Sequence, residues 1–243
     1  MKRLNIVTLL FIICASIAFV SCISRGGFST IKGNGNLVAT EIAVSEFERI
    51  NSGGSAEVRF HLSQEHRVVL TTDSNLIEYV EIITRNNSLN IGTKRGYSLS
   101  FTKWVVDVYS PTLTGISISG SGRFNSAEKI TVPTFTSNLS GSGRIEVVLE
   151  SETFSANISG SGRIVVTGNS NNSNIVISGS GRFNGTDFAV NYATVRISGS
   201  GNAGIWVTDN LSANVSGSGS IYYRGNPPTV NSSVSGSGRV NKL

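Results

Sequence analysis

Four consecutive copies of a repeated sequence unit are followed by an arginine, as is the last copy at Arg239, and the four consecutive arginines carry the clearest chemical signal in the chain. Each directly follows a Ser-Gly-Ser-Gly unit, at Arg123, Arg144, Arg163 and Arg182. The third residue of each of these units is a serine: Ser121, Ser142, Ser161 or Ser180. Guanidinium groups and hydroxyls together suit the carboxylate or sulfate groups of an acidic glycan. These residues are therefore the candidate binding site.

The alternative is that the arginines only form a solvated face. If the units stack about 4.8 Å apart, neighbouring guanidiniums repel by roughly 0.9 kcal/mol at the dielectric of water. Long side chains can splay apart and salt screens their charges, so an exposed row is tolerated without any ligand. The spacing alone does not decide between the two alternatives.

Carboxylates are the other groups that could do chemistry on a polysaccharide, because glycoside hydrolysis needs a pair of them. The repeated part of the chain holds Glu128, Glu146, Glu150, Glu152, Asp187 and Asp209. They do not recur at one position of the repeat, so we predict no catalytic residue and expect a protein that is not an enzyme. The alternative is a polysaccharide-active enzyme of the pectinase or lyase type, which would need a carboxylate cluster beside the arginines.

The remaining motifs predict no metal and no cofactor. His61 and His66 lie near Glu65, but without cysteine or clustered aspartate they make a poor metal site. Calcium-binding β-roll repeats need a recurrent aspartate, which this repeat lacks. Residues 199–204 match the glycine pattern of dinucleotide-binding loops, yet residues 205–208 continue as a strand where a helix should begin.

The elements that carry the arginines are set by a regular repeat. Ser-Gly-Ser-Gly begins at Ser119, Ser140, Ser159, Ser178, Ser198, Ser216 and Ser235. Successive units are 21, 19, 19, 20, 18 and 19 residues apart. The residue before each unit and the residue two places after it are always apolar, whereas a flexible linker has no apolar residues at fixed offsets. Around Ile158 apolar and polar residues alternate as in a half-buried strand.

These features predict an all-β fold, a right-handed β-helix or β-solenoid with rungs of about 19–20 residues. Each rung cannot bury its apolar face alone, so neighbouring rungs stack and equivalent residues form ladders. The glycines have two possible roles: they lie on the inner face, where a Cβ has no room, or they supply a positive φ at a corner. The sequence leaves both open.

Residues 46–115 predict a less regular β region that precedes the repeats of residues 116–243. Residues 50–58 resemble a degraded copy of the unit, so the solenoid is expected to begin there. Strand-like runs follow at 68–72, 88–91 and 104–109, and residues 76–82 could form a helical turn.

The N-terminus predicts export. A basic start and the apolar residues 4–20 precede Cys22, so residues 1–21 are interpreted as a lipoprotein signal peptide, Cys22 as the lipidated residue and residues 22–45 as a tether. The alternative is an uncleaved membrane anchor. Cys14 lies inside the apolar stretch, so no cysteine pair is left for a disulfide in the mature protein.

The chain carries only a small net positive charge. The net charge is +5, and loss of the signal peptide leaves 18 basic against 15 acidic residues, or about +3. Because no dense basic run is interleaved with aromatic residues, no nucleic-acid partner is predicted.

Several stretches resemble one bacterial family, the "putative auto-transporter adhesin, head GIN domain" proteins. They are residues 47–53 (FERINSG), 89–91 (LNI), 111–113 (PTL) and 118–122 (ISGSG). The resemblance spans roughly residues 46–225 and implies a β-helical lipoprotein of the Gram-negative envelope, an adhesin by architecture. It supplies no catalytic residues.

The expected partners follow from these points. The lipid on Cys22 would attach the protein to the outer membrane, since residues 23–25 lack an aspartate that would retain it in the inner membrane. The periplasmic and surface faces both stay open. An acidic glycan or an envelope protein is the expected ligand. Because the edges of solenoids are usually covered, the edge at the last unit is expected to be covered by a second copy of the chain, by a partner or by the N-terminal segment, and self-association is the prediction.

Overall fold

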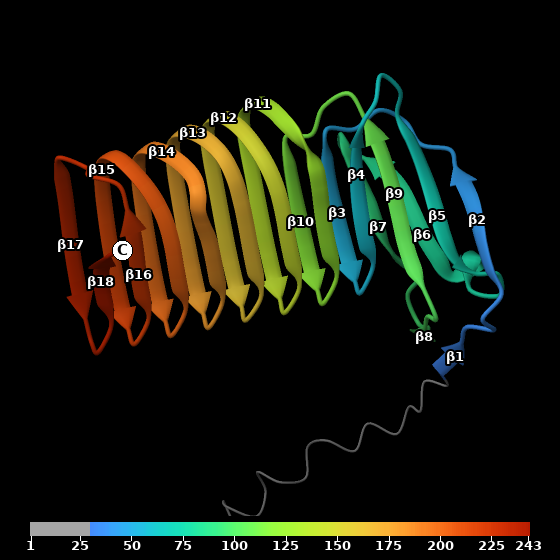
Figure 1. The fold of residues 1–243 in the computed structure, drawn as a ribbon. Coiled ribbons are helices and arrows are strands. Elements are labelled where there is room, and N and C mark those ends of the chain that lie inside the picture. The colour runs from blue at the N-terminus through green and yellow to red at the C-terminus, as the bar shows by residue number, and fades with distance from the viewer. Residues whose placement is uncertain (1–29) are drawn as a thin grey trace, which may run out of the picture.

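The computed structural model describes residues 30–243, and Figure 1 shows a row of stacked β rungs with a more irregular N-terminal part. The predicted signal peptide, the lipidated Cys22 and the first part of the tether lie outside the described residues. No helix in residues 30–243 is both long and apolar enough to cross a membrane.

The repeats form a β-solenoid of about 7 turns with rungs about 19 residues apart, which confirms the predicted fold class. Each full rung is one long bent strand that ends at a Ser-Gly-Ser-Gly corner (Figure 1). The strands of this part are β10 (Gly115–Gly120), β11 (Arg123–Gly141), β12 (Arg144–Gly160), β13 (Arg163–Gly179), β14 (Arg182–Gly199), β15 (Asn202–Gly217), β16 (Ser220–Arg224), β17 (Thr229–Ser235) and β18 (Arg239–Lys242). All of their pairings with one another are parallel, so each residue lies beside its equivalent in the next rung.

The core lies between the two arms of each bent strand. In β12 the side chains of Ile145, Val147 and Leu149 point inward from the first arm and those of Phe154, Ala156 and Ile158 from the second. The ring of Phe154 stacks on Phe135 of the preceding rung, with centroids 6.5 Å apart, and meets Phe188 edge to face at 5.2 Å. The alternation read from the sequence therefore becomes a continuous ladder of buried apolar residues.

The corner glycines take both of the roles that the sequence left open, one at each glycine of the unit. The first glycine of each unit has a positive φ, +117° at Gly160, which side chains rarely adopt. The second glycine faces inward and is buried in every unit except the last: a Cβ on Gly162 would lie 2.5 Å from Leu139 and 2.8 Å from the carbonyl oxygen of Gly143. The unit is thus a turn followed by a point of close contact with the preceding rung.

The solenoid begins with the degraded copy, as predicted. The first rung consists of β3 (Arg49–Gly54) and β4 (Glu57–Leu62), which pair in parallel with β10 and β11. Between β4 and β10 the chain leaves the solenoid and forms the other strands of the N-terminal part. Those strands are β5 (Arg67–Asp73), β6 (Val80–Arg85), β7 (Ser88–Thr93), β8 (Ser98–Ser100) and β9 (Trp104–Ser110).

Antiparallel pairs cover this end of the solenoid. β9 pairs in parallel with β4 and antiparallel with β5, while β7 pairs in parallel with β3 and antiparallel with β6. The predicted helical turn is a single turn of 3-10 helix at Ile77–Tyr79.

Part of the predicted tether is folded. Within residues 30–45, β1 (Thr30–Lys32) pairs with β8, and β2 (Leu37–Ile42) pairs antiparallel with β5. The tether prediction is therefore wrong for these strands. They are short and only alternately half-buried, so pairing with distant strands, together with contacts such as that of Ile42 with the core, holds them in place.

Asp73 ties three segments of the N-terminal part together from a fully buried position. Its carboxylate accepts hydrogen bonds from the amides of Gly35 and Thr102, both at 2.8 Å. Burial raises the pKa of Asp73, but the hydrogen bonds from Thr102, Gly35 and Lys103 together outweigh it, so the pKa lies below its ordinary value. Sequence analysis did not predict this role of Asp73.

The opposite end of the solenoid is open among the described residues. Every residue of β17 is exposed, and β17 and β18 pair only with β15 and β16. Self-association at this edge stays a prediction, and sedimentation over a wide concentration range tests it.

Candidate functional site

The strand register brings the four arginines of the repeat into one row. Arg123 lies beside Arg144, Arg144 beside Arg163, and Arg163 beside Arg182. The row continues with Asn202 and Ser220 in the following rungs. Its side chains point away from the core because their strand neighbours on both sides are buried. Neighbouring rungs of a sheet are about 4.8 Å apart, so four guanidinium groups line one outer face.

The two ends of the arginine row differ in charge. The guanidinium of Arg144 is paired with Glu146 two residues along its own strand, whereas Arg123, Arg163 and Arg182 form no ion pair within residues 30–243. Arg163 and Arg182 are followed at the same offset by Val165 and Asn184, which carry no charge. Uncompensated positive charge is therefore concentrated at the Arg163–Arg182 end.

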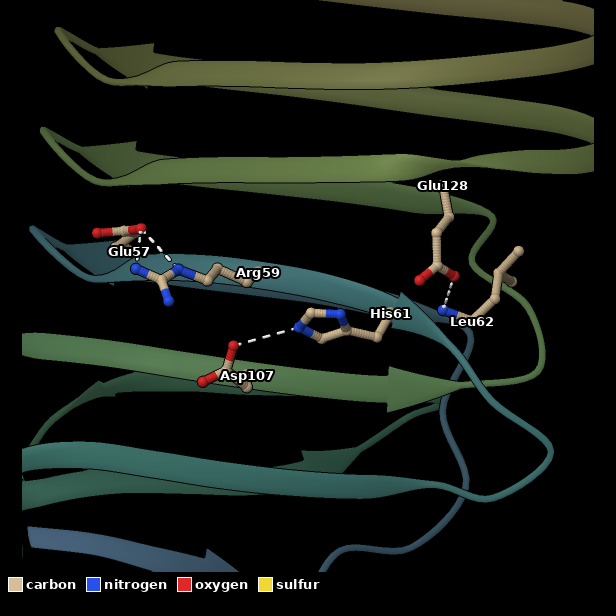
Figure 2. Close-up of polar contacts among 6 residues, drawn as sticks. All are labelled: Glu57, Arg59, His61, Leu62, Asp107 and Glu128. Atoms are coloured by element: carbon tan, nitrogen blue, oxygen red, sulfur yellow. Dashed lines mark hydrogen bonds and ion pairs between the residues drawn. The ribbon is translucent and has the colours of Figure 1, made fainter.

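Two carboxylates lie beside the arginine row, which sequence analysis did not predict. Glu57 of β4 is in register with Arg123, and Glu146 follows Arg144. With Phe124 and Asn125, these groups line a small cleft of about 290 Å³. Glu57 is bound by Arg59 at 2.7 Å, as Figure 2 shows.

The four serines lie at the corner, next to the arginine row. Ser121, Ser142, Ser161 and Ser180 are all exposed. The amide of Ser142 donates to the carbonyl oxygen of Gly120 at 3.0 Å, and the amide of Ser161 donates to that of Gly141 at the same distance. The main chain thus holds the corner while the hydroxyls face solvent.

The other acidic candidates are dispersed. Glu150 is paired with Lys129 at 2.5 Å, and Asp187 with Arg224 at 3.3 Å. Glu128 accepts a hydrogen bond from the amide of Leu62 at 2.7 Å (Figure 2). Each of these carboxylates has its own partner, and they do not form one cluster.

The two histidines are separated. His61 lies 3.2 Å from a carboxylate oxygen of Asp107 on β9 (Figure 2) and stacks on the ring of Tyr109. The guanidinium carbon of Arg67 lies 4.0 Å from the centroid of the same Tyr109 ring. His66 instead contacts the carbonyl oxygen of Phe47 at 3.0 Å. Within residues 30–243 no three His, Cys, Asp or Glu side chains are grouped so that they could hold a metal ion.

The fold and the arginine row define a class of protein: a capped β-solenoid that presents repeated polar side chains on its outer faces. Residues 46–227 match the family described as "Putative auto-transporter adhesin, head GIN domain". The chain belongs to this family, as the resemblance in the sequence indicated. No curated protein matches the chain.

Solved structures share the fold. A "putative adhesin" from Bacteroides fragilis superimposes with a TM-score of 0.83 at 21% identity, over 88% of this chain and 100% of that one. A "putative adhesin" from Parabacteroides distasonis has a TM-score of 0.73 at 31% identity, over 88% and 100% of the two chains. A "putative lipid binding protein" from the same species has a TM-score of 0.76 at 28% identity, over 88% and 99%. None of these three descriptions names an enzyme.

Proposed function

We propose that the protein is a non-enzymatic adhesin of the bacterial envelope that binds an acidic glycan along its arginine row. The observation that supports this most strongly is the register of Arg123, Arg144, Arg163 and Arg182 on one exposed face. A polymer that carries a carboxylate or sulfate on successive sugars would neutralise this flexible row of like charges and form charge-assisted hydrogen bonds with it. The family description and the adhesin relatives favour a binding protein over a catalyst.

The charge distribution along the row locates the proposed contacts. Glu57 and Glu146 lie at the Arg123–Arg144 end and would repel an anionic chain there. Arg163 and Arg182 have no such neighbour in the described residues, so they would make the principal contacts. Because both are accessible to solvent, their attraction for the polymer should weaken as salt is added.

Retention on immobilised heparin and on polygalacturonate tests this proposal. We expect the variant with Arg144, Arg163 and Arg182 all changed to Gln to elute at clearly lower salt than the wild type. The matched control changes the exposed Arg85, Arg95 and Arg196 to Gln, which removes the same charge from other places. If both variants elute alike, or if retention is unchanged, the arginine row is not a glycan site.

A polysaccharide-cleaving enzyme is the second candidate, since Glu57 and Glu146 lie beside the arginine row. Each of these carboxylates is bound by a guanidinium, and their side chains are 43% and 34% exposed. This differs from the buried, unpaired carboxyl that serves as a general acid in glycosidases. A depolymerisation screen on acidic glycans separates the candidates: released oligosaccharides that disappear in a Glu146→Gln variant would establish an enzyme.

We further propose that the protein is exported and held at the outer membrane by a lipid on Cys22. The apolar residues 4–20 before Cys22 support this, and the adhesin family agrees with an envelope protein. Labelling of cells with a radioactive fatty acid should mark the wild type and not a Cys22→Ala variant. Equal labelling of both would contradict the anchor.

A further inference from the structure

A second outer face of the solenoid carries a groove that differs in character from the arginine row. The groove has a volume of about 610 Å³ and crosses six strands from β7 through β3 and β10 to β13. At about 4.8 Å per strand it extends for about 24 Å along the solenoid. It is therefore long enough for an extended chain molecule.

The outward-facing side chains of the groove are small, polar and uncharged except for Glu81 and Val176. One row along it consists of Asn90, Asn51, Ser117, Asn138 and Asn157, which lie in register, and ends at Val176. The next row consists of Gly92, Gly53, Ser119, Ser140, Ser159 and Ser178. The buried residues Ile91, Ile118, Leu139 and Ile158 lie between these rows, so most of the groove surface is carbon. Glu81 of β6, which lies beside Gly92, brings the one carboxylate among the lining residues to the end of the groove.

Hydrogen bonds hold the amide row in a fixed orientation. Asn51 donates to Asn90 at 3.1 Å, and Asn157 donates to Asn138 at 2.9 Å. Asn138 in turn donates to the hydroxyl of Ser117 at 3.3 Å. Amides that are already ordered lose little conformational entropy when a ligand binds. The serine row beside them is exposed to solvent.

Two glycines widen the groove at positions where neither the backbone conformation nor steric crowding requires glycine. Neither Gly53 nor Gly92 has a positive φ. A Cβ on Gly92 would meet nothing within 4 Å, and one on Gly53 only a carbonyl oxygen at 3.8 Å. Glycine weakens a strand, and in a strand interior it often marks a place that another molecule approaches closely. The missing side chains leave a notch between Glu81 and the serine row.

We propose that this groove binds a linear neutral oligosaccharide that lies across the rungs. Sugars present hydroxyls at their edges and CH groups on their faces, which matches serine and asparagine side chains with exposed CH surfaces between them. The Glu81 carboxylate would accept hydrogen bonds from hydroxyls at one end. This site is separate from the proposed acidic-glycan site and does not depend on it.

Other occupants fit the groove less well. An acyl chain would match the carbon surface of the groove but would cover the hydroxyls and amides of its two rows without offering them hydrogen bonds, which costs free energy. A sugar can contact both the carbon surface and these polar groups. A peptide advances by about 3.3 Å per residue, so it falls out of step with side chains repeated every 4.8 Å. A strongly anionic polymer would meet Glu81 and no compensating cation among the lining residues.

Calorimetric titration of the full-length protein with cellohexaose, maltohexaose, mannohexaose and chitohexaose tests the proposal. We expect at least one of them to bind the wild type. Ser140→Trp should weaken that binding by tenfold or more, because it fills the groove at its middle. Ser216→Trp is the matched control: it changes the exposed serine at the same position of a unit outside the groove and should leave binding unchanged.

Further variants keep the test decisive. Gly92→Phe places a side chain in the notch where a Cβ meets open space, so it serves if Ser140→Trp fails to fold. The triple arginine variant should keep the neutral sugar while it loses heparin, which distinguishes the two proposed sites. The proposal is overturned if none of the four sugars binds, or if Ser140→Trp and Ser216→Trp weaken binding equally. Binding of laurate that Ser140→Trp blocks, without sugar binding, would overturn it as well.

Discussion

The regular solenoid and the N-terminal part stabilise neighbouring strands in different ways. In residues 115–243 each rung packs on an equivalent rung, and the same few residue types supply the corner, the inner ladder and the outer face. In residues 30–110 the strands pair both parallel and antiparallel, and individual side chains such as the buried Asp73 make contacts that occur once. Repetition spreads stability over many similar contacts, whereas the N-terminal part depends on particular residues.

The largest effect is expected at a corner glycine of the regular part. Gly160→Ala forces a side chain into a φ of +117° and places its Cβ 2.6 Å from the carbonyl oxygen of Gly141. The carbonyl oxygen belongs to the backbone and cannot move aside as the end of a flexible side chain can. We therefore expect the free energy of unfolding, measured in urea, to fall by about 3 kcal/mol or more. Gly53→Ala, in the irregular first rung, should change stability by less than about 0.5 kcal/mol because its Cβ has room. Similar losses at both positions would show that the corners are not special.

A smaller effect, with a distinctive pH dependence, is expected in the N-terminal part. Asp73→Asn keeps the shape but removes the charge that accepts the hydrogen bonds of Gly35 and Thr102, so the melting temperature should fall by several degrees. Because the pKa of Asp73 is lowered in the folded state, its contribution is fully present above the ordinary pKa of about 3.9. It is lost as the pH falls from there through the lower folded value.

Thermal melts from pH 7 to pH 2 check this sign. The difference in melting temperature between wild type and Asp73→Asn should be constant above pH 5 and should shrink below about pH 4. A difference that stays constant down to pH 2 would mean that the carboxylate acts only through its shape.

The smallest effect is a gain in stability at the arginine row. Arg163→Gln removes two like-charge neighbours, so at low salt it should stabilise the protein by a few tenths of a kcal/mol to about 1 kcal/mol. The gain should vanish in 0.5 M salt. Arg239→Gln is the control, because its register neighbour is Ser220 and not an arginine. Destabilisation by Arg163→Gln at low salt would contradict this account of repetition.

The same contrast explains which features could be predicted from the sequence. Units at nearly constant spacing can stack only in register, so the solenoid and the alignment of Arg144 with Arg163 followed from the period. The period did not predict which strand pairs with β2 or where Glu57 lies. Glu57 lies beside Arg123 because β4 pairs in parallel with β11. The chain leaves the solenoid between β4 and β10, which interrupts the period, and the degraded copy at residues 50–58 does not by itself fix this register.

Asp73 and the neutral groove were missed for related reasons. A lone aspartate at the end of a strand looks like a solvated turn residue until the segments around Gly35 and Thr102 fold over it. The groove is formed by residues such as Asn90 and Asn157, which lie far apart in the chain and become a row only through pairing. A glycine that the fold does not require, such as Gly92, can be recognised only once the space around it is known.

The corner unit has a consequence for how the length of such a protein can change. Each corner bonds to the corners directly before and after it: the amide of Arg163 donates to the carbonyl oxygen of Gly143, and the carbonyl oxygen of Gly162 accepts from the amide of Arg182. An in-frame duplication or loss of a segment such as residues 163–181 would therefore join matching surfaces and leave the N-terminal cap untouched. We expect the molecule to lengthen or shorten in whole steps, with one more or one fewer arginine in the row and one serine more or fewer along the groove side.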